Sequence, residues 1–402
     1  MQVERVVIAG AGLAGLRTAE ELRSRGYPGA IIMVGAEPWP PYDRPPLTKK
    51  FMTGQLDDTT LGADPAALGL DLRLGEAATG LDGGVLLTDR GELAFDALVL
   101  ATGSVPVGLP GNGGQRFLRT IDDARALRDA LLPGAQLAVV GAGWIGAELA
   151  TTALARGCQV TVVEAAASPL AGAVGTEVGS VTAPWYAEAG ADLRLGQPVE
   201  SVAANGLVLP GEGWLPADLT VVAVGVRPQV AWLAGSPVRL ENGVAVDGQL
   251  RTSAPGVYAA GDCAAFASAR YGRRLRVEHW DNALHAPRVV AANILGGDET
   301  YDPVPYFWSE QFGRMVQYAG HHSGADRLIW RGDPAGGDWA ACWLAAPGAA
   351  DGDGERLVAL LTVGRPRDLL QGRRVIAAGG AVDPGRLADP GIPVRDAVPA
   401  GA

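Results

Sequence analysis

The sequence predicts an α/β protein with two Rossmann-like nucleotide-binding domains and a C-terminal α+β domain. The main observation is a repeated glycine pattern, GAGLAG at residues 10–15 and GAGWIG at residues 141–146. Each copy follows a short apolar run, opens a stretch of helical character and is followed by a second apolar run that ends near an acid. This order of strand, glycine turn, helix, strand and acid is the dinucleotide-binding unit, and the full context makes it far more specific than a lone GxGxxG.

In the first unit, β-branched runs predict strands over residues 6–8 and 31–34, with a helix over residues 16–25 between them. The first glycine of the pattern makes a tight turn, and the second lets backbone N–H groups reach a pyrophosphate. The third glycine permits close packing of the helix on the strand. Glu37 is the acid expected to bind the ribose hydroxyls.

The second unit repeats the arrangement, with strands over residues 137–140 and 160–163, a helix over residues 147–156 and Glu164 as the acid. Because one such unit binds one nucleotide, two complete units predict that two nucleotides bind to this chain.

The rest of the chain alternates between apolar runs and turns. We expect short strands within residues 71–90 and 199–208, strands over residues 97–100, 219–224, 339–345 and 356–363, and helices over residues 122–132 and 283–295. Residues 347–354 are turn-rich, and the tail from Gly379 is expected to be loop or extended cover.

Asp262 ends the apolar run of residues 252–262, and residues 263–265 are expected to open a helix. In isolation, an aspartate at that place is an ordinary helix N-cap. A carboxylate at the carboxyl end of a buried parallel strand also points into the ligand crevice of an open α/β sheet. Beside two nucleotide units, the cofactor contact is the favoured interpretation, and residues 101–103 end another buried strand in the same way.

Composition narrows the function further. The net charge of −11 argues against nucleic acid as a partner, and no apolar run is long enough to span a membrane. The three cysteines include no CxxC or CxxxxC pair. This predicts a reducing compartment, taken here as the cytoplasm, and excludes a redox-active disulfide between cysteines at either spacing. The four histidines offer no metal-ligand set, and the N-terminus does not resemble a signal peptide.

Lys49 and Lys50 are the only lysines in the chain. The plain interpretation is a solvated surface pair. We favour a function for Lys49, because a compact ammonium suits a point contact with a cofactor better than a guanidinium fork does.

Several longer strings carry a resemblance to one family: PYDRPPLTK at residues 41–49, ATG at 101–103, the second glycine pattern with Glu148, residues 252–262, VEHW at 277–280 and PYFWS at 305–309. The chain resembles the ferredoxin reductases of oxygenase systems, which group with rubredoxin reductase and apoptosis-inducing factor among the glutathione-reductase-like flavoproteins. The resemblance covers the chain from about residue 3 to about residue 310 and fits the last ninety residues more loosely.

The resemblance implies FAD in the first unit and NADH in the second. It divides the chain into an FAD domain of two segments, residues 1–108 and 241–308, a NAD domain over residues 109–240 and a C-terminal domain over residues 309–402.

Carried over residue by residue, the resemblance places Lys49 along the flavin and Glu148 near the nicotinamide, which assigns both to the reaction. From these places we infer that the two form an ion pair beside the flavin. The expected flavin contacts are Gly10, Gly12, Leu13, Ala14, Gly15, Glu37, Arg44, Lys49, Ala78, Ala101, Thr102, Gly103, Arg119, Asp262, Trp280 and Trp308. The expected NADH contacts are Gly141, Gly143, Trp144, Ile145, Gly146, Glu148, Glu164, Gly225, Glu278 and His279.

Three positions depart from the family pattern. Ala36 stands where an acid is common, so the ribose contact is assigned to Glu37. Ser168 stands where a basic residue is common, and no Arg or Lys lies between Glu164 and Trp185, which favours NADH over NADPH. Tyr306 replaces a Trp near the docking surface of some relatives, which bears on the identity of the partner.

The resemblance implies an NADH-dependent flavoprotein reductase that supplies single electrons to a 2Fe–2S ferredoxin of a monooxygenase or dioxygenase. Two alternatives stay open from sequence: a rubredoxin or monodehydroascorbate-type reductase, and a redox-signalling flavoprotein with slow turnover. An acidic ferredoxin would need a local basic patch on this acidic chain. The arginines that could form such a patch are explained equally well as charges on a solvated loop. The candidate residues are Arg270, Arg273, Arg274, Arg276, Arg288 and Arg314.

Overall fold

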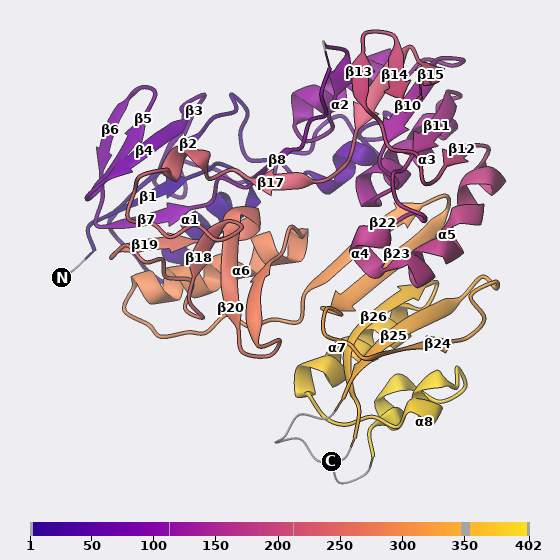
Figure 1. Cartoon of the computed structure of the whole chain (residues 1–402). Helices are drawn as coiled ribbons and strands as arrows, with labels where there is room; N and C mark the ends of the chain where they lie inside the picture. Colours follow the sequence, from indigo (N-terminus) through magenta and orange to yellow (C-terminus); the bar gives the residue numbers. More distant parts are fainter. Residues whose placement is uncertain (1–2, 112, 212, 347–353, 400–402) are drawn as a thin grey trace. The chain divides into compact units, whose positions relative to one another are not determined.

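The computed structural model describes residues 3–111, 113–211, 213–346 and 354–399 (Figure 1). The chain forms two compact units, each made of three separate segments. Unit 1 contains residues 1–44, 58–105 and 226–303, and unit 2 contains residues 45–57, 106–225 and 304–402. The turn-rich segment expected at residues 347–354 lies almost wholly outside the described residues. The domain boundaries drawn from the sequence stay predictions.

Unit 1 is built on a five-stranded parallel sheet in the order β19-β7-β1-β2-β3. Its strands are β1 (Arg5–Ala9), β2 (Ala30–Gly35), β3 (Leu70–Leu74), β7 (Ala97–Leu100) and β19 (Val257–Ala259). Every residue of β1 after Arg5 is buried, as is all of β7, which explains their unbroken apolar sequences. Helices α1 (Leu13–Ser24) and α6 (Trp280–Ile294) belong to this unit and pack on each other.

Two smaller sheets complete unit 1. An antiparallel sheet contains β4 (Ala78–Asp82), β5 (Val85–Thr88) and β6 (Gly91–Ala94). A mixed sheet contains β18 (Val244–Val246), β20 (Ala264–Ser268) and β21 (Arg273–Arg276), in which β20 is parallel to β18 and antiparallel to β21. Single 3₁₀ turns occur at η2 (Ala231–Leu233) and η3 (Gly261–Cys263), and β8 (Ser104–Pro106) pairs with β17 (Val226–Pro228).

Unit 2 contains a second five-stranded parallel sheet in the order β12-β11-β10-β16-β9. Its strands are β9 (Gln115–Arg116), β10 (Gln136–Val140), β11 (Gln159–Val163), β12 (Asp192–Arg194) and β16 (Leu219–Val222). The same unit contains η1 (Pro45–Thr48), helices α2 (Ile121–Ala130), α3 (Trp144–Ala155), α4 (Ala171–Val174) and α5 (Thr176–Ala189), and the small sheet of β13 (Ser201–Ala203), β14 (Gly206–Leu209) and β15 (Gly213–Pro216).

The C-terminal part of unit 2 is an antiparallel sheet in the order β22-β23-β26-β25-β24. Its strands are β22 (Tyr306–Gln311), β23 (Arg314–Gly320), β24 (Arg327–Arg331), β25 (Trp339–Ala345) and β26 (Arg356–Val363). Helices α7 (Pro366–Ala378) and α8 (Pro384–Ala388) and the turn η4 (Val394–Ala397) follow. This segregation of strands from helices is α+β architecture, so the predicted fold class is confirmed.

Two local predictions are wrong. Residues 263–265 do not open a helix: they leave a single 3₁₀ turn and enter β20, because pairing with β18 and β21 outweighs the helix propensity of alanine. The tail beyond Gly379 is also not only loop. Pro384 is the first residue of α8 and Asp383 caps it, so a proline that suggested a loop begins a helix.

Among the described residues, no helix combines the length and the apolar character needed to cross a bilayer. The three cysteines are free and buried.

Candidate nucleotide-binding and redox site

The first glycine of each pattern occupies a place that no side chain could share. Gly10 has φ +121°, and a Cβ there would lie 2.1 Å from the Ala101 carbonyl oxygen. Gly141 has φ +102°, and its Cβ would lie 2.6 Å from the Ala223 carbonyl oxygen. In both units the turn therefore passes directly against the end of the neighbouring strand, which only glycine allows.

The other two glycines are also equivalent in the two units. A Cβ on Gly15 or Gly146 would lie 2.0 Å from the carbonyl oxygen of the first glycine, so helix and turn are in closest contact there. A Cβ on Gly12 or Gly143 would meet nothing within 4 Å. The second glycine thus faces open space, where a phosphate group can approach the backbone.

Helices α1 and α3 begin directly after these second glycines, three residues earlier than expected, and neither has a side-chain cap. Their first N–H groups and the positive ends of their dipoles are thus available to an anion. This open glycine and uncapped helix start fit a dinucleotide pyrophosphate in both units. Leu13, Ala14, Trp144 and Ile145 lie in the first turns of these helices.

The two predicted ribose acids differ in their contacts. Glu37 accepts hydrogen bonds from the Tyr42 hydroxyl at 2.6 Å and from the Arg44 guanidinium at 2.7 Å. Glu164 accepts hydrogen bonds from the backbone N–H groups of Ala142 at 2.7 Å and Ala166 at 2.8 Å. Glu164 therefore also holds the glycine turn of its unit in place.

Asp262 lies at the carboxyl edge of the unit 1 sheet, as its position in the sequence predicts. It belongs to η3, directly after β19, and β19 pairs with β7, which ends just before residues 101–103. The Ser104 hydroxyl donates to Asp262 Oδ2 at 3.0 Å, and the Thr102 hydroxyl donates to the Gln229 carbonyl at 2.7 Å. Two strand ends far apart in sequence thus meet at one place.

Trp280 and His279 stand at the start of α6. The Trp280 indole N–H donates to Asp43 Oδ1 at 2.7 Å. Burial raises the pKa of Asp43, although this hydrogen bond acts in the opposite direction. Burial also lowers the pKa of His279 to about 4, against the negative charge of Asp262, so the imidazole is neutral at pH 7.

Four further residues that were predicted to contact FAD or NADH lie in different parts of the chain. Ala78 begins β4, Gly225 has φ +115° just before β17, and Glu278 pairs with Arg276. Arg119 precedes the capping box of α2 and donates its backbone N–H to Asp123 at 3.1 Å. Arg119 belongs to unit 2, whereas most of the other expected flavin contacts belong to unit 1.

Two aromatic pairs lie in the β22 region. Trp308 stacks on Tyr306 with ring centroids 6.0 Å apart, and Trp144 contacts Phe307 edge-on at 4.6 Å. Tyr306 accepts a hydrogen bond from Gln317 and lies under Arg373.

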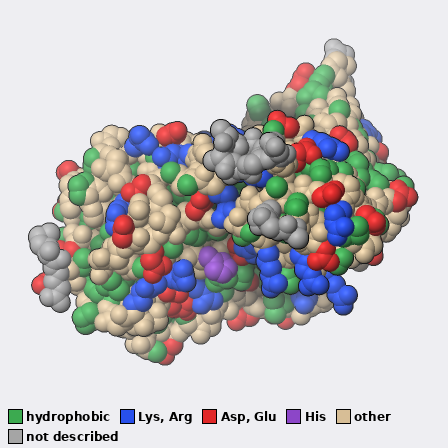
Figure 2. All heavy atoms as spheres, turned by 90° about the horizontal axis from the view of Figure 1, so that it is seen from below, with side chains coloured by type: hydrophobic (Ala, Val, Ile, Leu, Met, Phe, Trp, Pro, Cys, Tyr) green, Lys and Arg blue, Asp and Glu red, His purple; other side chains and the backbone are tan. Residues whose placement is uncertain are grey.

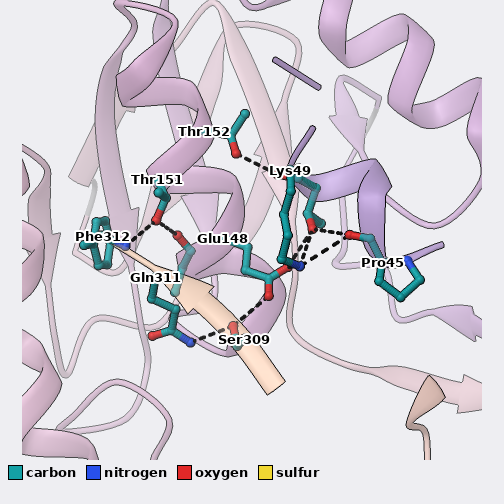
Figure 3. A network of polar contacts seen from close by, with 10 residues as sticks. Pro45, Lys49, Glu148, Thr151, Thr152, Ser309, Gln311 and Phe312 are labelled. Atoms are coloured by element: carbon teal, nitrogen blue, oxygen red, sulfur yellow. Dashed lines mark hydrogen bonds and ion pairs between the residues drawn. The ribbon is translucent and has the colours of Figure 1, made fainter. Parts of the chain in front are cut away.

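The ion pair predicted between Lys49 and Glu148 is present. Lys49 Nζ lies 2.7 Å from Glu148 Oε2 (Figure 3), and the two side chains are 17% and 5% exposed. Lys49 Nζ also donates to Thr48 Oγ1 at 3.2 Å and to the Pro45 carbonyl at 3.3 Å. All three N–H donors of the ammonium therefore have acceptors within unit 2.

Sequence reasoning missed two partners of this pair. Thr48 donates to Glu148 Oε2 at 2.6 Å, and Ser309 donates to Glu148 Oε1 at 2.7 Å. Thr48 lies in the PYDRPPLTK string and Ser309 in the PYFWS string. Membership in these two strings was the sequence signal that could have identified them.

The arginines proposed as a basic patch are mostly balanced by carboxylates. Arg274 lies 3.5 Å from Glu241, Arg288 lies 3.6 Å from Glu299, and Arg276 pairs with Glu278. Arg314, in unit 2, pairs with Glu188 at 2.7 Å. Figure 2 shows basic and acidic side chains intermixed over one face of the molecule. The patch stays a prediction, and these pairs reduce the charge available to it.

Residues 4–286 match the family described as pyridine nucleotide-disulphide oxidoreductase, and residues 306–398 match the reductase C-terminal domain. The chain belongs to the pyridine nucleotide-disulphide oxidoreductases. It is an oxidoreductase that uses FAD and NAD(H), the two nucleotides that the resemblance implied for the two glycine units.

This reductase is 36% identical to the ferredoxin–NAD(+) reductase component of the anthranilate 1,2-dioxygenase system of Burkholderia cepacia, over 98% of this chain and 99% of that one. It is similar to the crystal structure of Fdr9, with 48% identity, a TM-score of 0.92 and coverage of 97% and 99%. It is also similar to putidaredoxin reductase in its covalent complex with putidaredoxin, with 32% identity, a TM-score of 0.91 and coverage of 98% and 97%.

Proposed function

We propose that this reductase takes a hydride from NADH onto FAD and passes single electrons to a 2Fe–2S ferredoxin that serves a monooxygenase or dioxygenase. The observation that carries the proposal is the pair of equivalent glycine cradles, one in each unit, in a chain without a CxxC disulfide. Such a chain can bind two dinucleotides and has no dithiol of that kind to receive the electrons. The relatives named as ferredoxin reductase components support this acceptor over the alternatives.

The residues of unit 1 that would hold FAD are the first glycine pattern, Glu37, Arg44 and the strand ends around Thr102 and Asp262. The second glycine pattern and Glu164 would hold the nicotinamide nucleotide. When bound, FAD accepts electrons in pairs and releases them singly, which is the chemistry that a one-electron acceptor requires.

The contribution of the protein is binding, orientation and electrostatics. Uncapped helix starts bind the pyrophosphates, and the neutral His279 adds no charge beside Asp262 at pH 7. We assign Lys49 and Glu148 to the reaction on the resemblance, where a fixed ammonium would stabilise negative charge that develops during hydride transfer.

The proposal is tested by NADH-dependent reduction of cytochrome c with the reductase alone, with 2Fe–2S ferredoxins and with a rubredoxin. We expect fast cytochrome reduction only when a ferredoxin is present. Equal stimulation by rubredoxin would favour the rubredoxin alternative, and slow flavin turnover with every acceptor would favour a signalling flavoprotein. A monodehydroascorbate assay on the same preparation addresses the remaining alternative.

We also place the protein in the cytoplasm, because its three cysteines are free and buried and the chain has no CxxC pair. Cell fractionation with an untagged protein tests this location.

A further inference from the structure

The acid of the ion pair is held from two sides within unit 2. Thr48 and Lys49 contact one oxygen of Glu148, and Ser309 of β22 contacts the other, so both carboxylate oxygens are occupied (Figure 3). Glu148 is 5% exposed, and a buried carboxylate needs such donors to stay charged. The C-terminal sheet thus contributes directly to the environment of the pair.

Strand β22 presents two polar side chains on one face. Ser309 and Gln311 are both fully buried and flank the exposed Glu310, which is the alternation expected of a strand. Gln311 Nε2 donates to Ser309 Oγ at 3.1 Å. A serine hydroxyl has one proton, and Glu148 Oε1 at 2.7 Å is its acceptor. The bonds therefore run in one direction, from Gln311 through Ser309 to Glu148, and Lys49 donates to the other oxygen of the same carboxylate.

Helix α3 is also joined to the turn that follows strand β22, so a backbone N–H helps to hold this alignment. The Phe312 N–H donates to the Thr151 hydroxyl at 2.9 Å, one helical turn beyond Glu148 (Figure 3). The Thr152 hydroxyl donates to the Thr48 carbonyl at 2.6 Å, which fixes the segment that carries Lys49. Thr151, Thr152 and Glu148 lie on one face of α3 because of their spacing.

We infer that Ser309, oriented by Gln311, is a positioning residue for the Lys49–Glu148 pair, through which the C-terminal sheet controls the rate of flavin reduction. This inference rests on the proposed function, because it gives the pair its role in that reaction. A flexible carboxylate would let the ammonium sample several positions, whereas a carboxylate held at both oxygens keeps Nζ at one.

The first test observes the Lys49–Glu148 ion pair directly and needs no catalytic turnover. Because Lys49 and Lys50 are the only lysines, lysine labelled with ¹⁵N at Nζ introduces just two labelled ammonium groups, and the exposed Lys50 is an internal reference. In the FAD-free and FAD-bound protein, Ser309→Ala should shift the Lys49 signal and speed exchange of its ammonium protons with water several-fold, with Lys50 unchanged. Ser309→Thr, which keeps the hydroxyl, should restore the wild-type signal. An unchanged Lys49 signal in Ser309→Ala would overturn the inference.

The second test follows flavin reduction by NADH in stopped flow. Ser309→Ala should slow reduction about tenfold, the loss expected for one hydrogen bond to a charged group, while NADH affinity changes less than about twofold. Gln311→Met should act in the same direction but more weakly. In the double variant Gln311→Met should add nothing, because Gln311 acts only through Ser309.

A matched control is Thr362→Val in β26 of the same sheet. Thr362 is fully buried, and within the described chain its hydroxyl has no hydrogen-bond partner, so the change should alter neither the Lys49 signal nor the reduction rate. If Thr362→Val slows reduction as Ser309→Ala does, the effect is general to the sheet and the inference fails. If wild-type flavin is not reduced by NADH at all, the proposed function fails, whereas the Lys49 signal still tests the positioning contact.

Discussion

The indole N–H of Trp280 donates a 2.7 Å hydrogen bond to the carboxylate of Asp43, joining two strings that lie far apart in the sequence. Asp43 stands next to Arg44, and Arg44 pairs with Glu37, the predicted ribose acid of the first unit. Trp280 is the first residue of α6, a helix that packs on α1. One contact therefore aligns the polar groups expected around FAD.

We expect Trp280→Phe to raise the dissociation constant of FAD about tenfold, because the half-buried Asp43 carboxylate loses its hydrogen bond from the indole. Titration of the apoprotein with FAD, followed by flavin fluorescence, measures this change. Trp330→Phe is a matched control, since Trp330 Nε1 also donates to a carboxylate, that of Glu177 at 3.1 Å, within unit 2. Equal affinities of Trp280→Phe and wild type would show that the contact does not support the FAD site.

NADH should be preferred over NADPH by at least about tenfold in kcat/KM, which requires only about 1.4 kcal/mol of discrimination. The physical reason is repulsion between Glu164 and a 2′-phosphate, because no Arg or Lys lies in the segment that follows Glu164. Steady-state kinetics with both nucleotides measure the ratio. Glu164→Gln should reduce the preference for NADH. Equal kcat/KM values for NADH and NADPH in the wild type would refute the prediction.

FAD should be bound without a covalent bond. The PYDRPPLTK string contains no Cys or His, and its Tyr42 hydroxyl donates a hydrogen bond to Glu37. Precipitation with acid should release yellow FAD into the supernatant. Colour that stays with the pellet would contradict this expectation.

Lys49→Met should slow flavin reduction by NADH well beyond any effect on NADH binding, and it should lower the flavin potential. Loss of the ammonium removes a positive charge that favours the anionic reduced ring. Glu148→Ala should act mainly on nucleotide affinity, and the double variant should be non-additive because the two side chains are in contact at 2.7 Å. Stopped-flow reduction of the four proteins measures this cycle.

Lys50→Met is the control for that cycle, because Lys50 is exposed and next in sequence. If Lys49→Met keeps its FAD and its flavin is reduced at the wild-type rate, the lysine pair is only a solvated surface feature.

Thermal stability should decrease as the pH falls from about 6.5 to about 4 because of His279. The unfolded chain takes up a proton on this imidazole near pH 6.5, whereas the folded protein does so only near pH 4. The unfolded state therefore gains protons first, which costs about 3 kcal/mol of unfolding free energy across this window.

Melting curves of wild type and His279→Asn at pH 7.5 and pH 5 measure this loss. The variant should lose less stability than the wild type between the two values. His285→Asn, on the exposed face of α6, should follow the wild type. If His279→Asn loses as much stability as the wild type between pH 7.5 and pH 5, other groups cause the pH dependence.

The two glycine units could be predicted from the sequence by itself because their constraints are local. The first glycine needs a positive φ and has a strand end against it, the second must leave space and the third touches the turn. These demands act within a few residues, so they leave a pattern that can be recognised without a structure. The buried strands β7, β25 and β26 were predicted with the observed bounds for a similar reason, since each is a short apolar run between turn signals.

Only the tertiary structure decided which polar groups meet. Residues 264–268 became a strand because two partner strands were available, although their alanines favour a helix. The contacts of Trp280 with Asp43 and of Ser309 with Glu148 join residues 237 and 161 positions apart. Hydrogen bonds at such separations depend on how sheets and helices pack, and that packing is a property of the whole chain that no single segment encodes.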